Sequence, residues 1–248
     1  MPLGASRAGL MSVAVDDIPD SAVLHYPMID RSNNTIIETL EGADGTAQGT
    51  TNVSNNWHEG YAEDGDGNED YIELTNWSVV DFGSSLTSNW SILITTETSN
   101  GNDVWIMGND SGPDDMLFRL TIGHKNAGEG ELSYDMRDEN GNILEVSTNN
   151  RFDDGDKHRI VWNKTGNNAD DLEIWVDGSK QDVSIHEDED FSTVSNFNDF
   201  VALMSRNTDT GIADDGRNFE GVLDNLIVCN DSLDSSEISD DYQDQPWV

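Results

Sequence analysis

The chain has 248 residues and a mass of 27.3 kDa, enough for one large β domain with a substantial core. Its 50 acidic and 12 basic side chains give a formal net charge of −38, which excludes nucleic acid as a partner because no basic patch can replace phosphate counterions. A single cysteine, Cys229, excludes a disulfide framework within the chain, and no apolar run is long enough to span a membrane.

The acidic side chains are spread along the whole chain, so we expect most of them to be solvent-facing surface. Self-repulsion at this charge density destabilises a compact state at low salt, whereas at about 1 M salt the Debye length falls to about 3 Å. The composition therefore predicts a protein that works in molar salt, from an extreme halophile or a virus of one. Clusters of carboxylates are then weaker evidence for a site than they are elsewhere.

The first twenty residues differ from the rest because they carry almost no charge before Asp16. We predict that residues 1–20 form an arm, which docks onto another subunit or folds against the domain formed by residues 21–248. The stretch has one arginine and no sustained apolar core, so we do not expect a signal peptide.

From Ala22 onward, short apolar stretches alternate with turn residues, a pattern typical of a β-sandwich or jelly roll. Asn140-Gly141 and Asp177-Gly178 are typical hairpin turns. In chain order, the expected strands are Ala22–Asp30, Asp70–Leu74, Ser91–Thr98, Val104–Gly108, Met116–Ile122, Glu131–Asp138, Ile143–Val146, Lys157–Lys164, Asp171–Val176, Val201–Arg206 and Phe219–Cys229.

The C-terminal part combines a closing strand with a short helix. Gly221 within the strand pattern allows another backbone to pass close, and Cys229 is expected to be a small buried hydrophobe. Asp234 followed three residues later by Glu237 predicts a capping box that opens a helix, with Ile238 and Tyr242 on one face.

Six segments, in this order, resemble the laminin G-like domains of the concanavalin A-like lectin/glucanase jelly-roll family. They are Leu24–Asp30, Asp70–Leu74, Asn89–Ile94, Asp156–Trp162, Leu172–Gly178 and Phe219–Val228, and the match covers roughly Ser21 to Tyr242. The resemblance implies an all-β fold, a two-sheet antiparallel jelly-roll sandwich with a short C-terminal helix and the N-terminal docking arm. It also implies a surface recognition module, with a structural role for His158 and packing roles for Trp162 and Trp175.

Glycoside hydrolases of the laminarinase type share this fold and carry paired carboxylates that alternate with apolar residues on one strand. The nearest candidate here is His186–Phe191, but its intervening positions are charged, so we expect a solvated acidic loop. No Gly-x-Ser-x-Gly elbow, Cys/His pairing or zinc-ligand spacing occurs. We therefore predict that the protein is not an enzyme.

Calcium is the one cofactor that the sequence suggests. Asp64, Asp66, Asn68 and Asp70 place oxygen ligands at alternate positions around glycines, as a calcium loop requires, although a plain surface turn is the alternative. By the family resemblance, Asp30 and Asp224 would contribute to such a site, because the first and last strands pair in this fold.

Sugar binding usually needs an exposed aromatic ring beside Asp, Asn and Gly. Nothing in the sequence selects among the candidates, which are Trp57, Tyr61, Trp77 and Trp105, with Asn109 and Asp110 nearby.

Two functional interpretations remain open. In the first, the chain is a virion structural protein of a halophilic virus, a capsid decoration, turret or tail-fibre subunit at the virion surface. Residues 1–20 would contact other virion subunits, the protein would be a homo-oligomer, and its head would contact host glycans or a surface-layer protein. In the second, it is a secreted carbohydrate-binding or adhesion module at the cell surface of a halophilic archaeon.

Overall fold

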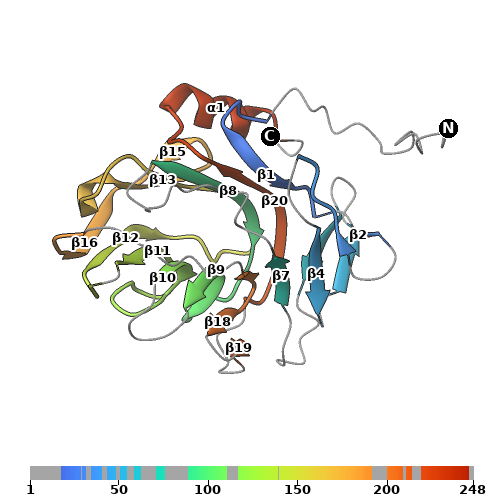
Figure 1. The fold of residues 1–248 in the computed structure, drawn as a ribbon, viewed down its shortest axis with the longest axis horizontal. Helices are drawn as coiled ribbons and strands as arrows, with labels where there is room; N and C mark the ends of the chain where they lie inside the picture. The colour runs from blue at the N-terminus through green and yellow to red at the C-terminus, as the bar shows by residue number, and fades with distance from the viewer. Residues whose placement is uncertain are drawn as a thin grey trace.

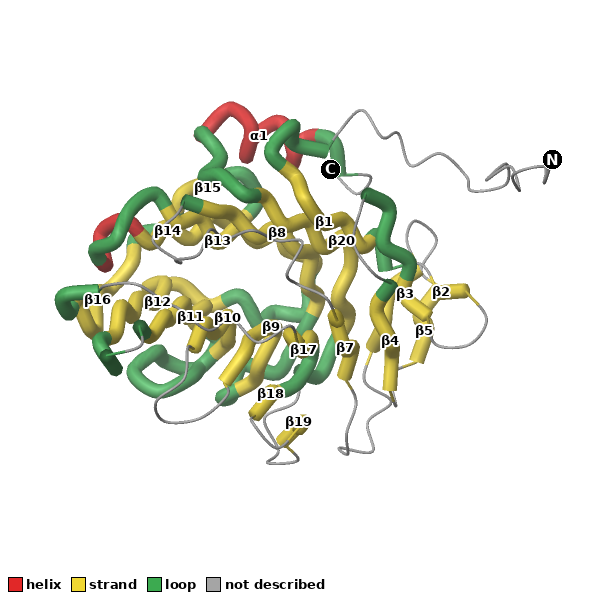
Figure 2. Tube along the Cα trace, in the orientation of Figure 1, coloured by secondary structure: helices red, strands yellow, loops and turns green. Residues whose placement is uncertain are grey.

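The computed structural model describes residues 18–28, 30–31, 35–40, 44–48, 51–54, 59–62, 71–75, 89–110, 117–138, 140–191, 200–208, 211–213 and 219–245. Within them, two antiparallel sheets lie face to face and form a sandwich (Figures 1 and 2). The predicted all-β sandwich with one short C-terminal helix is thereby confirmed.

The first sheet has eight strands among the described residues. Its order is β15 (Ser179–Lys180), β14 (Leu172–Val176), β13 (Lys157–Lys164), β8 (Trp90–Glu97), β20 (Val222–Cys229), β6 (Glu59–Ala62) and β5 (Thr51–Ser54), and β1 (Ala22–Tyr26) pairs with β20. The first and last long strands therefore pair, as the family resemblance implies.

The second sheet has ten strands among the described residues. Its order is β16 (Val183–Asp188), β12 (Ile143–Arg151), β11 (Glu131–Arg137), β10 (Leu117–Ile122), β9 (Val104–Asp110), β17 (Phe200–Leu203), β7 (Tyr71–Thr75), β4 (Gly45–Gln48), β3 (Thr35–Ile36) and β2 (Asp30–Arg31). A separate hairpin, β18 (Arg206–Thr208) and β19 (Gly211–Ala213), lies beside β9 (Figure 2).

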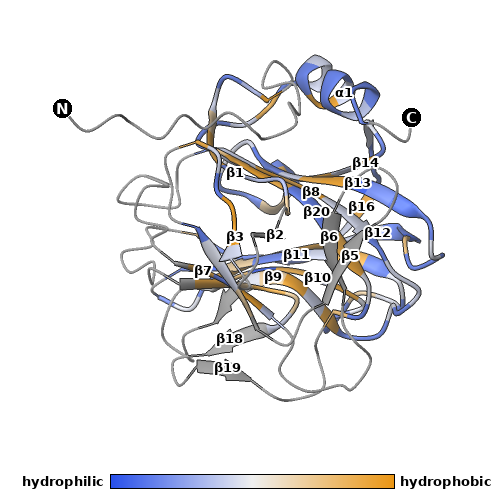
Figure 3. Cartoon of the chain, turned by 90° about the vertical axis from the view of Figure 1, so that its right-hand side faces the viewer, coloured by the Kyte–Doolittle hydropathy of each residue, from blue (hydrophilic) through white to orange (hydrophobic). Residues whose placement is uncertain are grey.

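Two apolar layers stabilise this arrangement. The larger layer fills the space between the sheets, where Trp90 and Trp162 are buried with alternate side chains of both sheets. In Figure 3, hydrophobic colouring marks parts of the strands of both sheets. The smaller layer lies on the outer face of the eight-stranded sheet and includes Leu93, Val161 and Ile238. Alternation of apolar and polar residues along the strands predicts the first layer, whereas the second requires the helix to cover the sheet.

Helix α1 (Ser235–Gln243) begins at the predicted capping box. The carboxylate of Asp234 accepts hydrogen bonds from the backbone of Ser236 and Glu237, and Glu237 returns one to the backbone of Asp234. A buried ion pair then fixes the helix to the sheet, because Arg159 Nε and Nη2 donate to the two carboxylate oxygens of Asp241 at 2.8 and 2.9 Å. No helix in the described part of the chain is both long enough and apolar enough to cross a membrane.

Glycine and cysteine in the closing strand region behave as predicted. A Cβ at Gly221 would collide with the carbonyl oxygen of Glu97, so only glycine allows β8 to pass this close. Cys229 is buried in the smaller apolar layer. His158 bonds to Asp177 and Asp154, Trp162 is a core residue, and Trp175 packs against the smaller layer, all consistent with structural roles.

Several expected strand boundaries are wrong; among them, the strand expected from Phe219 begins at Val222, and the strand expected to end at Arg206 ends at Leu203. The first strand ends at Tyr26, because Pro27 and the positive φ of Met28 interrupt it, and Asp30 belongs to the other sheet. The strand predicted to end at Val146 continues to Arg151. The first half of the acidic segment, His186–Asp188, is strand and not loop, since β16 (Val183–Asp188) forms the edge of the ten-stranded sheet, where exposed carboxylates are tolerated and blunt the edge.

The domain division stays a prediction, because most of the expected arm lies outside the described residues. Only its end is described: Ile18 packs against the smaller apolar layer, and the backbone N–H of Ala22 donates to the carbonyl oxygen of Pro19 at 2.9 Å.

Candidate functional site

Polar side chains occupy the face of the ten-stranded sheet that points away from the core. Along β10, Phe118, Leu120 and Ile122 enter the core, so Arg119 and Thr121 point to the opposite face. The same alternation applies to the neighbouring strands. We call the resulting surface the polar face; it consists of Trp105, Arg119, Thr121, Ser133, Asp135, Glu145 and Ser147.

Strand register arranges the polar face as two rows that run across the strands. In one row Arg119 lies opposite Asp135, which lies opposite Glu145. In the next row Thr121 lies opposite Ser133, and Ser133 lies opposite Ser147. Directly opposite residues on neighbouring strands have their Cβ atoms about 4.5–5.5 Å apart, so each row brings its functional groups within interaction range.

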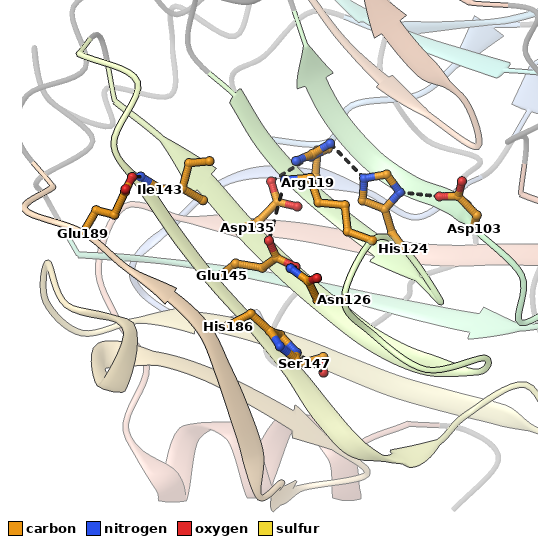
Figure 4. A network of polar contacts seen from close by, with 11 residues as sticks. Asp103, Arg119, His124, Asn126, Asp135, Ile143, Glu145, Ser147, His186 and Glu189 are labelled. Carbon is orange, nitrogen blue, oxygen red and sulfur yellow. Dashed lines mark hydrogen bonds and ion pairs between the residues drawn. The ribbon is translucent and has the colours of Figure 1, made fainter.

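Arg119 is the centre of the network in Figure 4. Its Nε donates to Asp135 Oδ1 at 2.7 Å, and its Nη1 lies 2.8 Å from His124 Nε2. The guanidinium also lies over the ring of Trp105, 5.5 Å from the ring centroid. Gly108, opposite Arg119 in the register, leaves room for this ring, because a Cβ there would lie 2.9 Å from Trp105 Cζ3.

The arginine determines which nitrogen of His124 carries the proton. A guanidinium only donates, so His124 Nε2 must accept, and the ring proton sits on Nδ1. His124 Nδ1 then donates to the carboxylate of Asp103. Burial lowers the pKa of His124 below its usual range, which agrees with a neutral imidazole in this position.

The second end of the network involves the loop between β10 and β11. Asn126 Nδ2 donates to Glu145 Oε1 at 3.2 Å, and Lys125 Nζ lies 3.6 Å from the other carboxylate oxygen of Glu145. Ser147 Oγ and His186 Nε2 are 2.9 Å apart at the edge strand. The loop side chains therefore reach back to the polar face and hold the carboxylate of Glu145.

The polar face is buried, although its residues are polar. Its seven residues are at most 6% exposed, whereas the side chain of Asp103 is 40% exposed and that of Lys125 is 30% exposed. Burial raises the pKa of Asp135, against the opposing effect of the positive charges of Arg119 and Lys125. Solvent reaches the network from the margin formed by Asp103, Lys125 and Asn126.

Four buried polar atoms on this face have no hydrogen-bond partner among the residues that the structure describes. They are Arg119 Nη2, Thr121 Oγ1, Ser133 Oγ and Asp135 Oδ2. An unsatisfied buried polar group costs about 1–3 kcal/mol, so four of them on two adjacent strands are an unusual concentration. Such an arrangement is suited to a polar ligand or to ordered water that supplies the missing bonds.

The fold is that of solved binding domains. Domain 4 of AbnA, a GH43 extracellular arabinanase from Geobacillus stearothermophilus solved with arabinotriose, is similar with a TM-score of 0.63 and 14% identity, over 90% of this chain and 98% of that one. The binding domain of botulinum neurotoxin DC, solved with rat synaptotagmin II, has a TM-score of 0.65 and 13% identity over 92% of this chain. The binding domain of Paraclostridial Mosquitocidal Protein 1 has a TM-score of 0.61 and 18% identity over 90% of this chain.

The chain spans about half the length of the two toxin domains, 52% in each case. No family model matches the sequence, and no curated protein matches it either. At these identities the likeness shows the fold, a β-sandwich of the kind used by carbohydrate- and receptor-binding domains. Membership of the laminin G-like family stays a prediction.

Among the predicted sugar-binding residues, Trp105 requires a correction. It is fully buried beneath Arg119, because the register places its ring inside the polar face, so it is not the exposed ring that the prediction requires. Tyr61 lies on β6 of the eight-stranded sheet, whereas Asn109 and Asp110 lie on β9 of the other sheet. Trp57 and Trp77 lie outside the described residues.

The predicted calcium ligands are not brought together within the described part of the chain. Asp64, Asp66, Asn68 and Asp70 lie outside it, and Asp30 lies in the sheet that does not contain Asp224. Asp224 itself is buried on β20, and its charged neighbours are the cations Lys157 and Arg159, a poor environment for a second cation. The described residues contain no group of three His, Cys, Asp or Glu side chains able to hold a metal ion.

Sequence inspection missed the polar face, although a signal was present. Arg119 and Thr121 interrupt an apolar strand at alternate positions, and Ser133 with Asp135 and Glu145 with Ser147 repeat the pattern on the next strands. The alternation of polar residues along each strand is visible in the sequence. Whether the polar residues of neighbouring strands lie opposite one another depends on the strand register, which the sequence does not specify.

Proposed function

We propose that this chain is a carbohydrate- or receptor-recognition module that binds its ligand at the polar face of the ten-stranded sheet. The observation that carries the proposal is the set of four buried, unpartnered polar atoms on β10 and β11. A preorganised group of donors and acceptors without internal partners gives a polar ligand bonds that water must otherwise supply. The four atoms are themselves buried, so a ligand reaches them only where the loop side chains at the solvent-reached margin, Asp103, Lys125 and Asn126, move aside.

Binding is favoured over catalysis by the state of the two neighbouring carboxylates. Asp135 and Glu145 lie opposite each other, but each is already held by a cation, Arg119 at 2.7 Å and Lys125 at 3.6 Å. Carboxylates that are each held in place by a cation form a fixed polar surface, which suits recognition more than acid–base chemistry. The similar solved structures include several described as binding domains, which supports the same conclusion.

The proposal is tested by the affinity of the full chain for immobilised glycans in molar salt. Arg119→Lys keeps the charge but loses the planar fork, so we expect glycan affinity to fall at least about tenfold. Arg151→Lys is the matched control, because Arg151 lies on the same sheet with an exposed side chain and pairs with Glu129 and Asp153. Equal losses in both variants, or no glycan binding by the wild type, would refute carbohydrate recognition at the polar face.

In its finer form, the module is the exposed head of a virion structural protein of a halophilic virus. The net charge of −38 and the nearly uncharged first residues support this form, and so does Ile18 at the end of the expected arm, which packs against the smaller apolar layer. Removal of residues 1–17 keeps Ile18 in place and should abolish oligomer assembly while the head stays folded. An unchanged oligomeric state would instead favour the secreted carbohydrate-binding or adhesion module of a halophilic archaeon.

We also propose that the loop at residues 64–70 binds a calcium ion. Asp224 does not fit the ion, for the reason given above, so any contribution must come from the loop itself. Calcium titration of the chelator-treated protein in molar salt should raise the unfolding temperature. The variant Asp64→Asn with Asp66→Asn should remove that rise, and an equal rise in both proteins would place calcium elsewhere.

A further inference from the structure

The four unpartnered atoms of the polar face differ in what they can donate or accept. Arg119 Nη2 only donates and Asp135 Oδ2, as a carboxylate oxygen, only accepts, while the hydroxyls of Thr121 and Ser133 can do either. Arg119 lies opposite Asp135, and Thr121 lies opposite Ser133, so the four atoms come from adjacent pairs on one face. A matching ligand must therefore offer both donors and acceptors at neighbouring positions.

A hydroxyl group is the simplest ligand group that donates and accepts at once. Two adjacent hydroxyls can accept from Arg119 Nη2 and donate to Asp135 Oδ2, with the Thr121 and Ser133 hydroxyls completing the set. A carboxylate or phosphate offers only acceptors, so it would satisfy Arg119 and leave Asp135 Oδ2 facing another oxygen.

The charges around these atoms oppose an anion as well. The network contains three acidic side chains, Asp103, Asp135 and Glu145. It contains two basic side chains, Arg119 and Lys125, and the neutral imidazole of His124. Each cation is therefore already opposed by a carboxylate. Because the network is buried, salt screens these charges less than it screens surface charges.

We propose that the four atoms form a subsite for a neutral polyhydroxyl ligand, a sugar with two adjacent hydroxyls, and that the subsite discriminates against acidic sugars. This inference rests on the proposed function and deepens it by naming the class of ligand. Arg119 and Asp135 bind the diol together, and Thr121 and Ser133 set its position.

The test compares two trisaccharides of similar size by calorimetric titration of the full chain in molar salt. Arabinotriose is the neutral probe, and trigalacturonic acid is the acidic probe. We expect the neutral probe to bind at least about tenfold more tightly than the acidic probe. A tenfold difference corresponds to one buried polar atom left unpaired in the complex with the acidic probe.

Two hydroxyl deletions keep the test independent of folding. Thr121→Val and Ser133→Ala remove hydroxyls that have no internal partner, so stability should be unchanged or raised, while arabinotriose affinity should fall about two- to tenfold. The matched control is Thr96→Val, because Thr96 Oγ1 on β8 of the other sheet is also buried without a partner. It should change stability in the same direction and leave affinity unaltered.

Asp135→Asn tests the discrimination itself, because it removes the charge but keeps the shape. The variant should bind arabinotriose less tightly and trigalacturonic acid more tightly than the wild type does. Circular dichroism checks that it folds, and the two hydroxyl deletions decide the matter if it does not.

The outcomes separate the two proposals. Equal or tighter binding of the acidic probe overturns the neutral-sugar subsite and leaves a recognition module in place. If Thr121→Val and Ser133→Ala leave the affinity for arabinotriose unchanged, the four atoms hold water only. That result also overturns the subsite. No binding of any glycan refutes carbohydrate recognition by the module and the subsite together.

Discussion

Arg119 and Asp135 face each other across β10 and β11 with a single contact of 2.7 Å, and each keeps one polar atom without a partner in the described structure. Arg159 and Asp241 make the opposite arrangement, with two parallel contacts of 2.8 and 2.9 Å. Both pairs are buried, yet only the second uses its carboxylate fully. Arg159–Asp241 therefore serves to fix the helix to the sheet, whereas Arg119–Asp135 keeps one donor and one acceptor for a further polar group.

Loss of the Arg159–Asp241 pair should be costly. Asp241→Asn leaves the guanidinium of Arg159 buried without its counter-charge, so we expect the free energy of unfolding to fall by roughly 3–5 kcal/mol. Chemical denaturation in molar salt measures this change. Asp240→Asn, an exposed position on the same helix, is the control and should shift stability by about 0.5 kcal/mol or less.

Asp224 should make the folded state less stable as the pH rises through the acid range. Burial raises its pKa from 3.8 to about 7, so between those values the folded state holds a proton that the unfolded state has lost. Its contribution to stability therefore falls from pH 4 to pH 7. Relative to the wild type, Asp224→Asn should gain roughly 3 kcal/mol over that interval.

Denaturation curves at pH 4, 5.5 and 7 for both proteins give the difference directly. A difference in unfolding free energy that does not change with pH would contradict the raised pKa of Asp224. Glu220→Gln, an exposed position near the start of the same strand, serves as the reference for general charge effects.

Ligand affinity should depend on pH through His124, which accepts from Arg119 only when it is neutral. Its lowered pKa keeps it neutral at and above pH 6.5, so affinity should be constant from pH 8 to pH 6.5. Below its pKa, a protonated ring would present a donor to Arg119 and release the guanidinium, and affinity should fall. The other charged groups that face this ring are Asp103 and Asp135.

The variant His124→Gln isolates this effect, because its amide oxygen can accept from Arg119 at every pH while Asp135 still titrates. Affinity for arabinotriose measured from pH 8 to pH 4 should fall more steeply with acid in the wild type than in the variant. Parallel profiles would assign the pH dependence to Asp135 instead.

Salt should stabilise the protein over the whole range up to several molar. The net charge of −38 makes self-repulsion the dominant long-range term at low ionic strength, and salt screens it. We expect the unfolding temperature to rise steeply between about 0.01 and 1 M sodium chloride, where the Debye length falls from about 30 to about 3 Å. An unfolding temperature that is independent of salt would contradict the inference of a halophilic source.

Local patterns along the chain were sufficient for much of the fold. Alternation predicted strands such as Lys157–Lys164 at their observed bounds, and Asp234 with Glu237 predicted the start of the helix. These features depend on residues within a few positions of one another, so the sequence itself carries them. The short strands β3, β4, β5 and β6 were not predicted, because runs of two to four residues contain too few alternations to be recognised.

The polar face depends on contacts between distant segments. Arg119, Asp135 and Glu145 come together only because three antiparallel strands align at one register, and a shift of one residue would turn them into the core. The register of β9 against β10 buried Trp105, and the strand order placed Asp30 and Asp224 in different sheets. The sequence by itself determined an acidic, all-β chain with a capped terminal helix, because those properties are local or compositional. Tertiary structure alone decided which polar side chains meet, because strand pairing is chosen by the packing of the whole core.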